Sequence, residues 1–88
     1  MPASAIDKHL GKRIASSREA ADLTLESLAE MIDYQPEQVA AMEAGTERVP
    51  SLALARISRV VDRPLSWFFE DLPGQEVFDA GETAKRSV

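Results

Sequence analysis

Two short apolar repeats separated by only three residues constrain this chain most. The first follows Thr24, whose hydroxyl suits a helix N-cap, and stops at Asp33, a residue type that tolerates a left-handed backbone. The second begins at Pro36, which fits the first helical turn because its φ is fixed and it has no N–H, and stops at Gly45. The apolar positions at helical spacing are Leu25, Leu28, Ala29, Ile32, Val39 and Met42, with Ala40 as a further candidate. The pattern predicts two helices, 25–32 and 36–44, joined by a tight turn.

Three further segments show similar starts and stops. We expect helices over 4–21, 51–61 and 65–71, because each has helically spaced apolar residues bounded by Asp, Pro or Gly. Asp22 and Asp62 would end the first two, and Ser51 can cap the middle one. Candidate core residues in these segments are Ile6, Leu10, Ile14, Ala21, Leu52, Ala55, Val60, Val61, Leu65 and Phe68. No stretch alternates for long enough to predict a strand.

The fold expected is therefore all-α, with five short helices in one domain over residues 1–74 and a polar, acidic, frayed tail over 75–88. The chain has no Cys and a single histidine, His9, which excludes disulfides, thiolate metal sites and multi-histidine metal sites. We find no nucleophile–base arrangement and no phosphate-binding loop, so we expect neither an enzyme nor a cofactor, and no small-molecule ligand is evident. The apolar runs are too short for a bilayer and no signal peptide is evident, which predicts a soluble, cytoplasmic protein.

The net charge of −5 argues by itself against a nucleic-acid binder. The charge is unevenly distributed, however. Residues 1–67 carry eight Lys or Arg and ten Asp or Glu, whereas residues 68–88 carry two and five. Most of the excess negative charge therefore lies in the tail, and the predicted domain is only mildly acidic.

The order of these elements resembles the Cro/cI-type helix-turn-helix family, also called the xenobiotic-response-element family. The similar segments are "LGKRIASSREAADLTLESLAEMI", "EAGTERVPSLALARISRVV" and "RPLSWFFEDL", which span about residues 10–72. A fairly specific marker is the element formed by Glu43, Gly45, Pro50 and Ser51. The resemblance implies a lambda-repressor-like fold whose second motif helix enters the major groove of double-stranded DNA. It also implies a structural ion pair between Arg18 and Glu43.

Carried over one position at a time, the resemblance implies a DNA-binding face around the second helix of the motif. Its residues are Gln35, Pro36, Glu37, Gln38, Ala41, Thr24, Leu25, Thr46 and Arg48. Glutamine can bond adenine edges, glutamate can accept from the amino group of cytosine, and proline or alanine can touch a thymine methyl. We also expect Arg13 and Lys12, and less clearly Arg56, to lie near the phosphates, with Arg59 and Arg63 as a solvated face. Leu25 stands where the family usually has a Gln that grips a phosphate or base, and leucine can do neither.

Two functions stay open on this evidence. The first is a sequence-specific DNA-binding regulator, acting as a dimeric repressor without an effector domain. The second is a helix-turn-helix scaffold for protein–protein interaction, for example a subunit paired with a more basic helix-turn-helix partner. The acidic residues of helix 36–44 and Leu25 favour the second function, whereas the complete family pattern and Arg48 favour the first.

An aromatic run, Trp67-Phe68-Phe69, points to a homodimer or a heterodimer. A helix cannot bury three consecutive large side chains on one face, so we expect Trp67 or Phe69 to be exposed or covered by a partner. Leu72 and Phe78 would extend this surface. In the resembling family, the last helix region often forms a two-fold contact.

Overall fold

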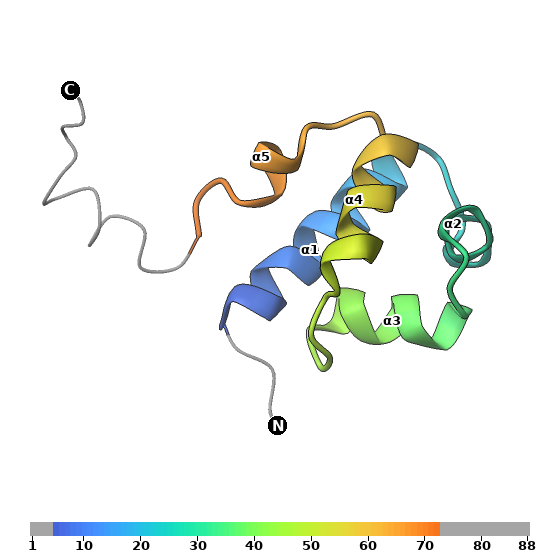
Figure 1. The fold of residues 1–88 in the computed structure, drawn as a ribbon, viewed down its shortest axis with the longest axis horizontal. Helices are drawn as coiled ribbons and strands as arrows, with labels where there is room; N and C mark the ends of the chain where they lie inside the picture. Colours follow the sequence, from blue (N-terminus) through green and yellow to red (C-terminus); the bar gives the residue numbers. More distant parts are fainter. Residues whose placement is uncertain (1–4, 73–88) are drawn as a thin grey trace, which may run out of the picture.

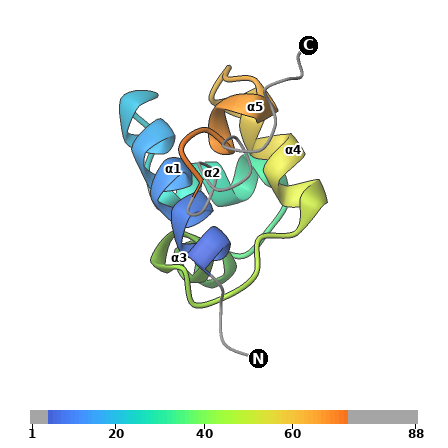
Figure 2. The same cartoon turned by 90° about the vertical axis from the view of Figure 1, so that its left-hand side faces the viewer.

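The computed structural model describes residues 5–72 as five helices without a strand. The helices are α1 (Ala5–Ala20), α2 (Leu25–Ile32), α3 (Pro36–Ala44), α4 (Ser51–Val60) and α5 (Leu65–Phe68) (Figure 1). They pack as a ring in which α1 contacts α3, α3 contacts α2, α2 contacts α4, and α5 closes the ring between α4 and α1. Figure 2 shows α1 and α4 on opposite sides, with α3 at one end and α5 at the other. The predicted all-α fold is confirmed.

One apolar cluster fills the centre of this ring and receives side chains from every helix. Burial of such side chains is the main favourable term in folding. The cluster consists of Leu10, Ile14, Leu28, Ala29, Ile32, Val39, Met42, Val49, Ala53, Leu54, Ile57, Val61 and Phe68. No helix within residues 5–72 has the length and apolar character that crossing a bilayer requires.

Four residues predicted to stop helices have the left-handed backbone that such a stop requires. Asp22, Asp33 and Asp62 have φ of 63°, 64° and 58°, in the left-handed region, and Gly45 has φ of 77°. Thr24 caps α2, because its hydroxyl oxygen accepts the N–H of Ser27 at 3.0 Å. The stop at Asp33 ends α2 and leaves only three residues before α3 begins at Pro36.

Some predicted boundaries were wrong. The fifth helix ends at Phe68 instead of residue 71, because the chain leaves the helix at Phe69 and Asp71 adopts φ of 60°. Helices α1 and α4 each end one residue earlier than expected, at Ala20 and Val60. Ser51 is the first residue of α4 and not its cap; Pro50 holds that position, and no side chain caps the helix.

Several core assignments were also wrong. Five residues expected in the core are exposed, namely Ile6, Ala21, Ala40, Leu52 and Leu65. In α4, Ala53, Leu54 and Ile57 are buried instead, while Ala55 and Val60 are only half-buried. The segment "SLALARISRVV" has apolar residues on two faces, and periodicity alone selected the wrong one. Val77, Phe78 and the proposed tail lie outside the described residues.

The contact between α1 and α3 brings two backbones together at Gly11. A β-carbon at this position would collide with the carbonyl oxygen of Met42 and lie 2.7 Å from that of Glu43. A β-carbon on Gly45 would lie 2.8 Å from Cγ of Lys8. The last turn of α3 is therefore held directly against α1, and this contact fixes the direction of α3.

Candidate nucleic-acid interface

The start of α3 is organised by the side chain of Gln38. The Gln35 N–H donates to Oε1 of Gln38 at 2.8 Å, and the Gln38 N–H donates to the Gln35 carbonyl at 3.0 Å. Between them lies Pro36, which has no N–H. The first turn of α3 therefore offers few free donors to a phosphate, in contrast to most helix N-termini.

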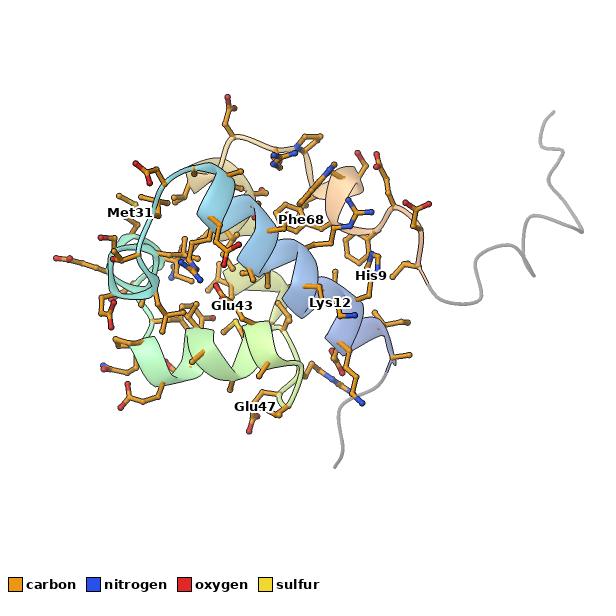
Figure 3. All side chains as sticks on the ribbon, turned by 180° about the vertical axis from the view of Figure 1, so that it is seen from behind. His9, Lys12, Met31, Glu43, Glu47 and Phe68 are labelled. Atoms are coloured by element: carbon orange, nitrogen blue, oxygen red, sulfur yellow. The ribbon has the colours of Figure 1, made fainter. Side chains whose placement is uncertain are left out.

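A pocket of about 370 Å³ lies along the outer side of α3. It brings together four residues of the predicted DNA-binding face, Glu37, Gln38, Ala41 and Arg48. Its other lining residues are Tyr34, Met42, Glu47 and Pro50, which we did not predict. Tyr34 could have been identified from the sequence, because it is an aromatic residue in the turn between the two motif helices. Figure 3 shows Glu47 at the outer edge of the α3–α4 loop.

The other predicted contacts lie around this pocket or beside α2. Gln35 and Thr46 are exposed and Pro36 is half-buried. The Thr24 hydroxyl is engaged with Ser27, donating to its Oγ at 2.9 Å as well as accepting its N–H. Leu25 is half-buried and packs on the core. The main role of Thr24 and Leu25 is therefore to stabilise α2.

The predicted cations are divided between two environments. Arg48 is exposed and forms no ion pair within residues 5–72. Arg13 instead contacts the α5 region, donating to the Glu70 carbonyl at 3.1 Å and to Asp71 Oδ2 at 3.3 Å. Arg56 donates to the Ile32 carbonyl at 2.9 Å and so joins α4 to the end of α2. Arg13 and Arg56 do not line the α3 pocket.

Lys12 lies on α1, where it lines a second, smaller pocket of about 200 Å³. Lys8 and His9 line the same pocket. Figure 3 shows His9 and Lys12 on α1. Lys12 is exposed and has no ion pair within the described part of the chain. The α3 pocket therefore contains a single cationic side chain, that of Arg48.

Arg18 and Glu43 form the ion pair that the resemblance implied. Arg18 Nε donates to Glu43 Oε2 at 2.7 Å and Nη2 donates to Oε1 at 3.2 Å, a two-point geometry. Nη1 of the same guanidinium donates to the Leu23 carbonyl at 2.8 Å. The hydrogen bond to Glu43 raises the pKa of Arg18 above its usual value. Figure 3 shows Glu43 between α1 and α3, where the pair joins the two helices.

The aromatic run is divided between core and surface, as expected. Phe68 is fully buried, whereas 40% of the surface of Phe69 is exposed. Trp67 is half-buried, with the guanidinium carbons of Arg13 and Arg63 at 4.7 Å and 4.3 Å from its ring centroid. The contact to Trp67 means that Arg63 is not simply a solvated charge. Leu72 is half-buried, and Phe78 lies outside the described residues.

Comparison with known proteins agrees with this architecture. A helix-turn-helix family model matches residues 14–68. An uncharacterized HTH-type transcriptional regulator of Sinorhizobium medicae is 39% identical over 69 residues, which is 78% of this chain and 50% of that protein. Another from Rickettsia conorii is 37% identical over 67 residues, 76% of this chain and 54% of that protein. The chain thus spans about half the length of the curated relatives it matches.

Two solved structures share the fold. The clp gene regulator ClgR from Corynebacterium glutamicum superposes with a TM-score of 0.74 at 24% identity, covering 90% of this chain and 84% of that one. The restriction-modification controller protein C.AhdI from Aeromonas hydrophila gives a TM-score of 0.70 at 23% identity, covering 75% of this chain and all of that one. With the family model matching more than half of the residues, the chain belongs to the helix-turn-helix family of the Cro/cI type.

Proposed function

We propose that this protein is a sequence-specific DNA-binding transcriptional regulator. The observation that carries the proposal is the pocket on the outer side of α3, where Glu37, Gln38 and Ala41 lie beside Arg48, which forms no ion pair within residues 5–72. These side chains supply an acceptor, a donor, a methyl group and one phosphate-binding cation. The relatives named as transcriptional regulators support the same function.

The charge of this face favours a protein that acts as a dimer. One Arg and two acidic residues line the pocket, so a single subunit gains little from phosphate contacts. Two copies on a palindromic site double those contacts and add no repulsion within each half-site. The exposed Phe69 and Leu65 near the end of the described chain provide an apolar surface for the second copy. We propose a dimeric, cytoplasmic repressor that acts by occupying DNA and has no catalytic role.

The first test is fluorescence anisotropy of the protein titrated onto duplex DNA from immediately upstream of its own gene. A scrambled duplex of equal composition is the control, and each titration is run at about 50 and 200 mM salt. The proposal requires tighter binding to the native duplex at both salt concentrations. Equal, weak binding to both duplexes would contradict it.

A second candidate function is that of a protein-interaction subunit paired with a more basic helix-turn-helix protein. The acidic residues on α3 and the half-buried Leu25 at the start of α2 favour this function. The fold also occurs in the SinR protein/SinI protein complex, which superposes with a TM-score of 0.66 at 23% identity. Phe69→Ala separates the alternatives when mass and DNA affinity are measured together. Loss of the dimer together with loss of binding to the native duplex would favour the dimeric regulator. Weak, equal binding to both duplexes by the wild type, unchanged in Phe69→Ala, would favour the interaction subunit.

A further inference from the structure

The hydrogen bond between Gln35 and Gln38 fixes which end of the Gln38 amide faces outward. A backbone N–H can only donate, so the Gln38 atom that it meets at 2.8 Å must be the carbonyl oxygen. The NH₂ group of Gln38 therefore points away from this bond, on an exposed residue that lines the α3 pocket. This assignment follows from the chemistry of the partner and not from a choice between two similar atoms.

We propose that Gln38 reads DNA through its NH₂ group and selects guanine, an inference that rests on the proposed function. The familiar two-bond pairing of glutamine with adenine needs the amide oxygen to accept from the adenine amino group. In this protein one lone pair of that oxygen accepts the Gln35 N–H, and this bond turns the oxygen toward the backbone and the NH₂ group away from it. Guanine presents two adjacent acceptors, O6 and N7, in the major groove, whereas adenine and thymine present one each and cytosine presents only an amino donor. Readout through the NH₂ group therefore favours guanine and rejects cytosine.

Glu37, the residue before Gln38, accepts hydrogen bonds where the Gln38 amide group donates them. Glu37 is exposed and lines the same pocket, and its carboxylate can only accept hydrogen bonds. It suits the amino group of cytosine or adenine and repels the acceptors of guanine. The outer side of α3 thus presents a hydrogen-bond acceptor at Glu37 and a donor at Gln38. This pair fits two neighbouring bases, one that offers a donor and one that offers acceptors.

The bond from the Gln35 N–H opposes any rotation of the Gln38 amide that would present both of its polar atoms to a base. If Gln38 turned outward to bind adenine with both atoms, the Gln35 N–H would have to find water instead. Water is available at this exposed site, so the expected result is a preference measured as a ratio of affinities and not an absolute exclusion.

The test is a selection from random duplexes with the wild type, Gln38→Glu and Ala40→Glu. A carboxylate at position 38 still accepts the Gln35 N–H, as glutamate does in capping boxes, but it has no donor. Ala40 is exposed on α3 and does not line the pocket. Ala40→Glu adds the same charge to the same helix and keeps the Gln38 amide, so it reports the uniform loss that the charge causes. Circular dichroism and urea unfolding of each variant verify that the helices are retained.

We expect the wild type to enrich guanine at one position of each half-site. Gln38→Glu should lower the guanine-to-adenine preference at that position about tenfold, whereas Ala40→Glu should leave this ratio unchanged. Replacing that guanine with 7-deazaguanine should weaken the wild type and not Gln38→Glu. The inference is overturned if the wild type selects adenine there and needs its amino group, or if Gln38→Glu keeps the guanine preference. A wild type that enriches no sequence would instead overturn the proposed function itself.

Discussion

The two sides of α3 are built in opposite ways. On the inner side, Val39 and Met42 are buried in the core, and Glu43 is held by two hydrogen bonds from Arg18. On the outer side, Glu37 and Gln38 are exposed and line an open pocket with Arg48. The inner side has its partners within the protein, and the outer side has polar groups available for a partner outside it.

This difference separates stability from recognition within one helix of nine residues. The inner contacts determine where α3 lies relative to α1, and the outer side chains determine what it can bind. Substitutions on the inner side should therefore lower the free energy of unfolding. Substitutions on the outer side should change DNA affinity and leave unfolding nearly unchanged.

The largest effect is expected at Gly11, where α1 and α3 meet through their backbones. Gly11→Val should lower the free energy of unfolding by about 3 kcal/mol or more, because the new side chain overlaps the Met42 carbonyl and the backbone there cannot move aside easily. Urea unfolding followed by circular dichroism measures this change. Ser16→Val, on an exposed position of α1, is the control for the lower helix propensity of valine. Equal effects of both substitutions would mean that the close contact at Gly11 is unimportant.

A smaller loss is expected at the Arg18–Glu43 pair. Arg18→Ala should cost about 2 kcal/mol, less than for a fully buried pair, because both side chains retain some exposure. Removing the arginine leaves the Glu43 carboxylate and the Leu23 carbonyl without their donors. A double-mutant cycle with Glu43→Ala measures the coupling, and a coupling near zero would show that the pair does not fix α3 on α1.

The inner side was more predictable from the sequence than the outer side. The bounds of α2 and α3 and the left-handed stops at Asp33 and Gly45 were correct, because turn chemistry is local and few residue types tolerate positive φ. The buried face predicted for α4 was wrong, because its apolar residues occupy two faces and only tertiary packing decides which one is buried. The ion pair came from family resemblance and not from spacing, because its partners are 25 residues apart.

The roles of two polar side chains could not be predicted for a different reason. Arg13 was expected near the phosphates, but in the structure it contacts Trp67 and Asp71, a partner 58 residues away in the sequence. Gln38 was expected to bond adenine edges, but in the structure its oxygen accepts the Gln35 N–H. A glutamine at the N-cap is not a usual capping-box residue, so the sequence carried no clear signal for that bond.

On the outer side, the largest effect is expected from Arg48. Arg48→Ala should weaken binding to native and scrambled duplexes alike by about tenfold and reduce the salt slope by about one per subunit, because one phosphate contact is lost. Arg59→Ala removes the same charge from an exposed position outside the α3 pocket and is the matched control. The free energy of unfolding should change little in either variant. If Arg59→Ala weakened binding equally, the effect would come from net charge and not from the pocket.

The smallest effect, and the one that most sharpens the comparison, is expected from Glu37→Gln. The carboxylate is exposed at the first turn of α3 and repels phosphates, so its removal should raise affinity for scrambled DNA a few-fold, with the gain shrinking as salt is added. The same carboxylate favours the helix N-terminus, so the free energy of unfolding should fall by about 0.5 kcal/mol.

Affinity for the preferred duplex should rise less than affinity for scrambled DNA, because the acceptor that reads an amino group is weakened. Anisotropy titrations on both duplexes at two salt concentrations measure the ratio. If both affinities rose by the same factor, Glu37 would contribute only repulsion, and base reading by α3 would rest on Gln38 and its neighbours alone.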